Sequence, residues 1–481
     1  MSESKCVLAL YDCRSKQEYI YRTNRIQEIS GGSRLLADLF PDAFKSAKEL
    51  GFKIHSDWES ADTPPDFLRN FEESGNDAEI IYEGGGNLCV IYKNRETYVR
   101  MNRLLSRKAL EKSFTISIIA ACTEVTGDFY EDRRRLYAEN ARQKNLGAYY
   151  TPCNVLPFTQ VDRRTYQPIV KKTDKHQYTT ESLRKKEKFD SINDGESELN
   201  LESMREKGED SILAVIYIDG NNMGAKVKDA TTNSGAPISD YSESIRRLRA
   251  FSKQTNEDFV KQPLAAIKTA LMQAMQTSKK KQHYKCRVVI RSGDEITLIC
   301  NAHAVPLILK TYFETLTAQS KNSACAGVAL FHSHDPFADV YEIAEQSCEM
   351  GKKESHKAGN GDKNYIDFHY CHAGITNDLE TLRETQEGDL TAKPYEFSTT
   401  WQTFLHYGKM LSEATRSQVK SLCDAIIRGD SYYVETLRMI QSRKRLKEIS
   451  ETDKTVKKMI FDIASVYDLW FPGDEKGGSN E

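Results

Sequence analysis

Apolar residues occur along the chain in short continuous runs, separated by longer segments in which they recur at helical spacing. Short runs rich in Val and Ile predict buried β-strands, whereas apolar positions three or four residues apart predict amphipathic helices. From about residue 376 only helical spacing remains. The pattern therefore predicts an α/β part followed by a helical bundle. The strand-like runs are at residues 7–11, 78–81, 88–92, 115–122, 213–218, 286–290, 296–300, 324–331 and 365–369.

The strand landmarks of the first part return at a nearly constant offset in the second part. Asp12 corresponds in this way to Asp219, and the turn at residues 86–87 corresponds to Asp294 and Glu295. A constant offset between several landmarks indicates an internal duplication. We therefore predict two ferredoxin-like α+β domains, of which the first has lost two of the three acidic residues.

Three acidic residues of the second repeat are placed where a metal site could form. Asp219 ends a buried strand. Asp294 and Glu295 lie at the tip of a predicted hairpin, after Ser292 and Gly293. Converging carboxylates repel one another unless a cation is present, and Mg²⁺ or Mn²⁺ prefers oxygen ligands. Two such ions can hold the attacking and leaving oxygens of a phosphoryl transfer, so we predict a two-ion site at Asp219, Asp294 and Glu295.

Composition excludes several classes of protein. The 481 residues contain 68 Lys and Arg against 70 Asp and Glu, so the net charge of −2 indicates no polyanion partner by itself. No apolar run could span a membrane, and the N-terminus lacks the apolar segment of a signal peptide. The 11 cysteines include no Cys-x-x-Cys pair, which argues against a disulfide framework and a structural zinc site. We expect a reduced, cytoplasmic protein.

Residues 131–210 are predicted to form a charged connector, partly helical, between the two α/β domains. Residues 163–188 are rich in Lys and Arg, and residues 189–210 are rich in Asp and Glu. Such blocks are usually solvated, so the connector is predicted to bury little. A nucleic-acid contact by the basic block is the alternative, although no aromatic ladder accompanies it in the sequence.

In this order the motifs resemble the palm-domain family of nucleotide cyclases and polymerases, in particular the large palm-bearing subunit of type III CRISPR complexes. The resemblance rests on Tyr11-Asp12, Gly31-Gly32-Ser33, the Asp-Gly-Asn-Asn-Met-Gly run at 219–224, the Ser292–Glu295 hairpin and the Leu-Thr-Ala-Lys-Pro-Tyr run at 390–395. With the apolar pattern it implies a degenerate first palm at 1–130, the connector at 131–210, a catalytic second palm at 211–375 and a helical C-terminal domain at 376–481.

In that family the second palm is similar to GGDEF diguanylate cyclases and makes cyclic oligoadenylates from ATP. The resemblance implies that Asp219 and Asp294 bind metal and that Glu295 replaces a second hairpin Asp. Lys352 or Lys353 resembles the lysine that neutralises the terminal phosphates. The implied nucleotide-binding residues are Gly220, Asn221, Asn222, Met223, Gly224, Ser292, Gly293, Lys352 and Lys353.

The hairpin departs from the family pattern, because it reads Ser-Gly-Asp-Glu in place of Gly-Gly-Asp-Asp. The choice between ATP and GTP therefore stays open. Since the chain begins at the first palm, we expect a compact form without the family's HD nuclease domain and zinc-binding cysteine pairs.

The predicted function is synthesis of a cyclic or linear oligonucleotide messenger in prokaryotic antiviral defence. The alternative is a catalytically silent palm that binds a nucleotide or an RNA complex as a sensor or scaffold. The expected partners are ATP or another nucleoside triphosphate, a second copy of the chain, and RNA or a CRISPR-type complex; a membrane is not expected.

Overall fold

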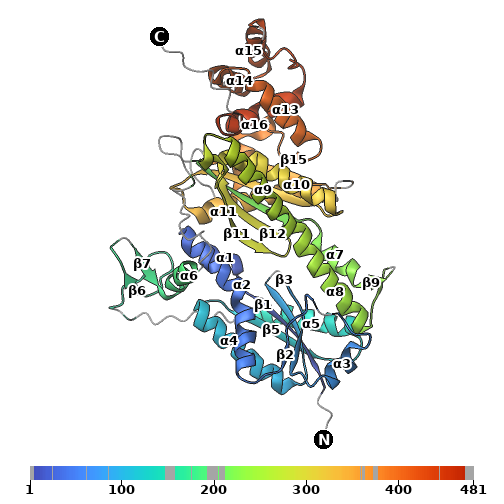
Figure 1. Ribbon diagram of the computed structural model, residues 1–481. Coiled ribbons are helices and arrows are strands. Elements are labelled where there is room, and N and C mark those ends of the chain that lie inside the picture. Colours follow the sequence, from blue (N-terminus) through green and yellow to red (C-terminus); the bar gives the residue numbers. More distant parts are fainter. Residues whose placement is uncertain are drawn as a thin grey trace. The chain divides into compact units, whose positions relative to one another are not determined.

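The chain divides into two compact units, each built around one larger β-sheet (Figure 1). One unit consists of residues 1–200, 222–260 and 289–294, and the other of residues 201–221, 261–288 and 295–481. The computed structural model describes all residues except 1–4, 24, 61, 85, 147–155, 157, 175, 192–203, 205–211, 234, 358, 360–362, 372–377, 444 and 472–481.

The first unit is built on a five-stranded sheet with the order β2-β3-β4-β1-β5. The central strand β1 is buried along its whole length, as its apolar run predicts, and pairs antiparallel with both β4 and β5. The strands are β1 (Val7–Cys13), β2 (Ile54–His55), β3 (Ala78–Gly84), β4 (Asn87–Tyr92) and β5 (Ile118–Glu124). The helices are α1 (Lys16–Tyr21), α2 (Ile26–Glu49), α3 (Phe67–Glu73), α4 (Arg95–Ser113), α5 (Phe129–Leu146) and α6 (Thr180–Asp190).

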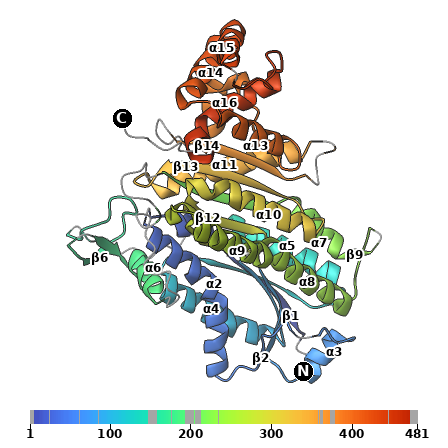
Figure 2. The same ribbon diagram turned by 45° about the horizontal axis from the view of Figure 1, so that its top comes forward.

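The second repeat forms a six-stranded sheet with the order β11-β12-β8-β13-β14-β15. Its strands are β8 (Ile212–Gly220), β11 (Cys286–Ser292), β12 (Glu295–Asn301), β13 (Ala324–His332), β14 (Tyr365–Tyr370) and β15 (Tyr395–Glu396). The helices α9 (Gln262–Thr277) and α10 (Val305–Gln319) lie side by side (Figure 2), and α11 (Phe337–Ser355) packs on β13 and β14. Short hairpins are formed by β6 (Ile169–Lys172) with β7 (Gln177–Thr179) and by β9 (Thr232–Asn233) with β10 (Ala236–Pro237).

The strand order confirms the duplication inferred from the sequence. In the first sheet the neighbours β3-β4-β1-β5 match β11-β12-β8-β13 in the second, with a buried central strand between two antiparallel partners in each. The helices that follow also correspond, since α5 comes after β5 and α11 comes after β13. The predicted fold class, two α+β palms and a helical part, is confirmed.

The C-terminal part is mostly helical, but the prediction of helices alone from residue 376 is wrong at Tyr395–Glu396, which form β15 and pair with β14. Its apolar stripes come together in a core around Trp401, Phe404 and Ile463, all of which are fully buried. Among the residues that the structure describes, no helix is both long and apolar enough to cross a membrane. The helices are α12 (Leu379–Gln386), α13 (Thr400–Leu411), α14 (Arg416–Arg428), α15 (Asp430–Ser442) and α16 (Lys454–Trp470).

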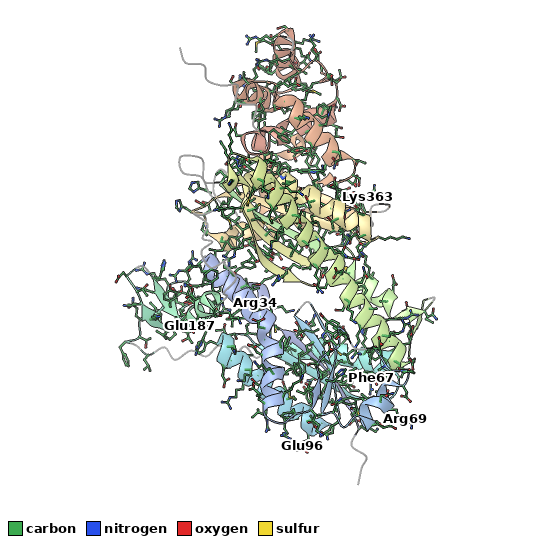
Figure 3. All side chains as sticks on the ribbon, in the orientation of Figure 1. Arg34, Phe67, Arg69, Glu96, Glu187 and Lys363 are labelled. Carbon is green, nitrogen blue, oxygen red and sulfur yellow. The ribbon has the colours of Figure 1, made fainter. Side chains whose placement is uncertain are left out.

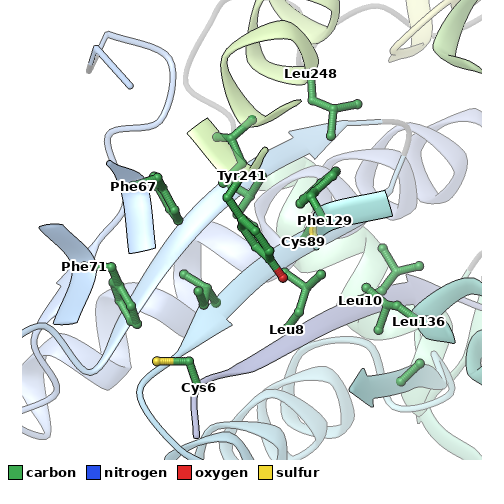
Figure 4. Close-up of a cluster of buried hydrophobic side chains, with 14 residues drawn as sticks. Cys6, Leu8, Leu10, Phe67, Phe71, Cys89, Phe129, Leu136, Tyr241 and Leu248 are labelled. Atoms are coloured by element: carbon green, nitrogen blue, oxygen red, sulfur yellow. The ribbon is translucent and has the colours of Figure 1, made fainter. Parts of the chain in front are cut away.

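The helix α8 (Tyr241–Asn256) packs on the sheet of the first repeat although it lies within the sequence of the second. Its side chains Tyr241, Ile245 and Leu248 belong to the same buried cluster as Leu8 and Leu10 of β1 (Figure 4). The predicted boundary at residue 211 therefore does not separate the packing units. A pattern of apolar spacing identifies the helix but does not say which sheet it covers.

A buried arginine fixes α8 to strand β3 of the first sheet. The Arg249 side chain is only 3% exposed, and its Nη2 donates to Glu79 Oε1 at 3.0 Å. The same guanidinium donates to the carbonyl oxygens of Ile80 and Ile81 at 2.9 and 3.0 Å. Because a planar guanidinium with several satisfied donors tolerates burial, this cluster holds the helix in a defined position.

The prediction that the basic block 163–188 is solvated is wrong for its C-terminal part, because α6 is packed on α2. Lys185 is fully buried, and its Nζ donates to Glu181 Oε1 at 2.6 Å. Glu181 also accepts from Arg22 at 2.8 Å. Gly31 of α2 makes this packing possible, since an added Cβ would lie 1.9 Å from the Lys185 carbonyl oxygen.

Candidate active site in the second palm

The predicted acidic residues lie at the ends of two neighbouring strands, β8 and β12. These strands are antiparallel, and Ile218 lies opposite Ile296. One further step along this register places Asp219 opposite Glu295. Residues directly opposite each other project to the same face of a sheet. The register therefore brings these two carboxylates to one face.

Helix α11 covers this face and carries a lysine to Asp219. Gly327 of β13 lies so close to the helix that an added Cβ would be 1.9 Å from the Ala344 carbonyl oxygen. The contact at Gly351 of the helix is less close, since an added Cβ would lie 3.2 Å from Tyr365 Cβ of β14 and 3.4 Å from Cys325 Cβ of β13. The close approach that these glycines permit places Lys352 Nζ in an ion pair with Asp219, with 17% and 21% of the two side chains exposed.

The pKa values of Tyr217 and Lys352 are shifted in part by the nearby carboxylates. Burial raises the pKa of the Tyr217 hydroxyl well above its usual range, and the charges of Glu295 and Asp219 raise it further. Burial by itself lowers the pKa of Lys352, but the Asp219 carboxylate and its hydrogen bond outweigh burial and raise that pKa above its ordinary value. An ammonium beside Asp219 is therefore fully charged at neutral pH.

The predicted hairpin is present, with a two-residue turn between β11 and β12. Gly293 has a φ of 63°, a left-handed conformation that favours glycine at this turn position. Asp294 is the second turn residue and is partly buried, whereas the side chain of Ser292 lies outside the described part of the structure. Within the described residues, no three His, Cys, Asp or Glu side chains form a group that could hold a metal ion. The role of Asp294 as a third ligand stays a prediction.

The loop after Asp219 is held from inside the protein by Asn221. This side chain is buried, and its Nδ2 donates to Ser323 Oγ at 3.2 Å and to the Lys363 carbonyl oxygen at 3.1 Å (Lys363 is labelled in Figure 3). The Asn221 backbone N–H also donates to the Ser323 carbonyl at 2.8 Å. Asn221 thus positions the loop, in addition to the nucleotide contact predicted for it.

The rest of the loop leads directly into helix α7 (Met223–Ala230). Gly220 is the last residue of β8, and Asn222 precedes the helix in a left-handed conformation with a φ of 56°. Gly224 is exposed, and an added Cβ would meet nothing within 4 Å. The internal packing does not require glycine at this position, which leaves its backbone accessible.

The part of the chain that carries these features matches a known protein family. Residues 212–364 match the family model of the Cas10/Cmr2 second palm domain. This stretch of the chain is thus similar to a Cas10/Cmr2 second palm domain. The resemblance predicted from the sequence is therefore confirmed, although no curated protein matches the chain.

Several solved Csm1 structures share the fold of this chain. Csm1 from T. onnurineus is 12% identical, with a TM-score of 0.57 over 97% of this chain and 69% of Csm1. A Csm1–Csm4 cassette in complex with one ATP is 12% identical, with a TM-score of 0.56 over 97% of this chain and 70% of the other. A cassette in complex with cA3 gives 12% identity and a TM-score of 0.55 over 96% and 70%. At this identity the likeness shows the fold alone.

The structure distinguishes the two candidate lysines of the second palm. Lys352 contacts Asp219, whereas Lys353 is 60% exposed and its Nζ pairs with Glu380 of α12 at 2.6 Å. The two lysines are neighbours on a helix and so point in different directions. Only Lys352 lies at the predicted site.

Two kinds of supporting residue were not predicted from the sequence. Tyr217 lies two residues before Asp219, and strand alternation would have placed both on one face. Ser323 and Asn364 hold the start of β13, where the Asn364 Oδ1 accepts from the Ala324 N–H at 2.8 Å. No local pattern marks these two residues, because their partners are distant in sequence.

The corresponding place in the first palm holds two lysines. Asp12 lies opposite Asn87, and its carboxylate pairs with Lys16 at 3.3 Å and with Lys144 of α5 at 2.5 Å. Gly86 corresponds to Asp294, and an added Cβ there would be 2.5 Å from Lys16 Nζ. In the first palm the Lys16 ammonium therefore lies beside Gly86, at the position where the second palm has an acidic residue.

Proposed function

We propose that the second palm is a metal-dependent nucleotidyltransferase that joins ATP molecules into a cyclic or linear oligonucleotide messenger. The observation that carries the proposal is the placement of Asp219 and Glu295 on one face of the sheet, with Lys352 against Asp219. Solved structures of similar fold support it, since Csm1–Csm4 cassettes are in complex with one ATP, with pppApA and with cA3. The pppApA ligand contains one adenylate more than ATP.

In such a reaction a ribose hydroxyl of one ATP attacks the α-phosphorus of another, and pyrophosphate leaves. Asp219, Asp294 and Glu295 would hold Mg²⁺ or Mn²⁺, as one or two ions, which supply charge stabilisation to the attacking and leaving oxygens. The oxygen donors of Asp219 and Glu295 fit a hard cation, because the strand register places both carboxylates on one face of the sheet.

Lys352 is the residue of this chain that would meet phosphate. Its ammonium lies against Asp219 and is fixed by the close packing of α11 on the sheet. It would contact the terminal phosphates of a bound triphosphate while Asp219 serves as a metal ligand. The exposed backbone at Gly224 would allow the triphosphate to approach the start of α7.

The proposal extends to the setting in which the chain works. The similar structures named Csm1–Csm4 contain a second subunit, so we infer that this chain joins a CRISPR-type complex in antiviral defence, with ATP as the preferred triphosphate. Association with a second copy of the chain belongs to the same proposal.

A second candidate function is a catalytically silent palm that binds a nucleotide as a sensor. One observation favours it: Asp219 has an internal cation in Lys352, and within the described residues no third carboxylate joins Asp219 and Glu295 in a metal-binding group. Such a palm would bind ATP without producing pyrophosphate.

The two candidates are separated by a turnover experiment. The protein is incubated with each of the four nucleoside triphosphates and Mg²⁺ or Mn²⁺, and the products are identified by mass spectrometry. The proposal expects oligoadenylates and pyrophosphate from ATP. Binding of ATP by calorimetry without any product would support the silent palm, and turnover of GTP alone would correct the base preference.

A further inference from the structure

A buried arginine of α12, Arg383, connects helix α11 to the sheet of the second palm. Its Nη1 and Nη2 donate to the two carboxylate oxygens of Asp367 on β14, at 2.7 and 2.5 Å. The Arg383 side chain is 9% exposed, and that of Asp367 is fully buried. The same guanidinium donates to the Phe368 carbonyl oxygen at 2.9 Å and to Met350 Sδ of α11 at 2.9 Å. Arg383 thus contacts both the strand and the helix.

Asp367 lies at the place where α11 comes closest to the sheet. The strand register pairs Asp367 with Gly327 of β13. Gly327 is the residue whose added Cβ would be 1.9 Å from the Ala344 carbonyl oxygen of α11. Neighbouring residues of adjacent strands share a face, so Asp367 projects to the face that α11 covers (Figure 2). The helix is therefore held by two contacts, the glycine contact at Ala344 and the guanidinium contact at Met350.

The support of this arginine is itself well fixed. The first residue of α12, Leu379, donates its backbone N–H to Gln346 Oε1 of α11 at 2.8 Å. From the segment after α12, Lys393 Nζ donates at 3.3 Å to the Phe368 carbonyl oxygen, which also accepts from Arg383. The guanidinium is therefore held from both sides in the sequence of α12.

A buried ion pair of this kind supplies position more than stability. Removing two charges from water offsets much of their attraction, so apolar residues of similar volume often stabilise a core as well. The fork of a guanidinium, however, satisfies both oxygens of a carboxylate in one orientation. Met350 lies two residues before Lys352 on the same helix. A contact that fixes Met350 therefore also fixes the start of the Lys352 side chain.

We propose that Arg383 is a positioning residue for Lys352. It holds α11 at the place from which the Lys352 ammonium reaches Asp219. The role of Lys352 toward a triphosphate rests on the proposed function, whereas its contact with Asp219 does not. The experiment therefore has one readout that needs no turnover and one that does.

The test variant exchanges both partners, Arg383→Met with Asp367→Val, because Arg383→Ala would leave a carboxylate buried without its cation. The first readout is the rate of acylation by an amine-reactive ester, followed by mass spectrometry of the peptide 350–354 that cleavage after glutamate releases. In the wild type Lys352, 17% exposed, should react more slowly than Lys353, 60% exposed. In the double variant the ratio of the two rates should shift toward one.

The second readout is a double-mutant cycle on kcat with ATP. In the wild-type background the paired exchange should lower kcat about a hundredfold, the effect of a displacement of about 1 Å. In a Lys352→Met background the same exchange should cause no further loss, because Arg383 acts through Lys352. A merely structural role would give the same loss in both backgrounds. The control is Arg438→Met, whose side chain is 68% exposed and pairs with Glu451, and it should change neither readout.

An unchanged ratio of acylation rates in the folded double variant would overturn the proposal, and so would equal losses of kcat in the two backgrounds. If the double variant does not melt cooperatively, Arg383→Lys replaces it and is judged by the same results, since one ammonium cannot reproduce the fork. A wild type that makes no product from ATP would refute the proposed function, and the acylation ratio alone would then decide the role of Arg383.

Discussion

The two palms share one strand plan but differ in the charge at the same position of the sheet. In the first palm Asp12 lies opposite Asn87 and is paired with two lysines, Lys16 and Lys144. In the second palm the register places Asp219 opposite a second carboxylate, and one lysine, Lys352, pairs with it. The first palm thus places two lysines on the single carboxylate of Asp12, whereas the second palm places Glu295 opposite Asp219.

The two palms keep one strand plan although the charges at this position of the sheet differ. Lys144 of α5 and Lys352 of α11 occupy corresponding helices, so an Asp–Lys pair is common to both repeats. The change is the second lysine, Lys16, whose ammonium lies beside Gly86. We therefore expect a divalent cation to bind in the second palm rather than in the first.

The largest effect is expected from a change that removes the support of the first palm. Arg249→Ala should lower the free energy of unfolding by about 3–5 kcal/mol, because it leaves Glu79 buried without its guanidinium partner. Chemical unfolding measures this loss. The control is Arg246→Ala on the same helix, whose side chain is 60% exposed and should contribute less than about 1 kcal/mol. Equal effects of the two changes would show that α8 does not stabilise the first sheet.

The next effect is expected on turnover in the second palm. Asp219→Asn and Asp294→Asn should each reduce the rate of product formation from ATP on the order of a hundredfold to a thousandfold, or about 2.7–4 kcal/mol, since each removes a charge from the reacting centre. The matched change Asp12→Asn in the first palm should leave turnover unaltered. The rates are measured by pyrophosphate release. If only Asp12→Asn abolished product formation, the first palm would be the active one.

A smaller effect is expected from the lysine of the second palm. Lys352→Met should destabilise the metal-free protein by about 1 kcal/mol and increase the stabilisation that Mg²⁺ provides, because Asp219 then lacks its ammonium partner. The pKa of Lys352 is raised in the folded state, so its contribution is fully present below the ordinary lysine value of about 10.4 and is lost as the pH rises through the raised pKa.

Melting curves of the wild type and Lys352→Met with and without Mg²⁺, at about pH 7 and pH 9, check this expectation. The difference between the two proteins should be the same at both pH values. The corresponding lysine of the first palm is Lys144, whose side chain is 48% exposed. The variant Lys144→Met keeps Lys16 beside Asp12, so Mg²⁺ should add no further stability to it. A gain in Mg²⁺ stabilisation for Lys144→Met would contradict the comparison.

Much of the fold could be predicted because the buried strands are continuous apolar runs. The strands around Leu8 and Val215, the hairpin at Gly293 and the helical C-terminal part all follow from local patterns. The carboxylate pair could be located for the same reason, since Asp219 directly follows such a run. The choice between the neighbouring lysines at 352 and 353 could not be made, because it depends on how closely α11 approaches the sheet.

The features that sequence patterns missed depend on contacts between distant segments. In the sequence, the charges of Lys185 and Glu181 suggest that α6 is exposed to solvent. In the structure, the two side chains neutralise each other in the interior. Gly31 was recognised only as part of a motif, whereas the structure shows that α6 packs against it. The assignment of α8 to the first sheet depends on Arg249, whose partners are far away in the chain.

The central claim is that the second palm, and not the first, binds a divalent cation. Electron paramagnetic resonance of added Mn²⁺ tests it most directly, because free and bound ions give distinct signals without any need for turnover. The account predicts that the wild type and Asp12→Asn bind Mn²⁺ equally and that Asp219→Asn loses this binding. Unchanged binding in Asp219→Asn, or its loss in Asp12→Asn, would contradict the account.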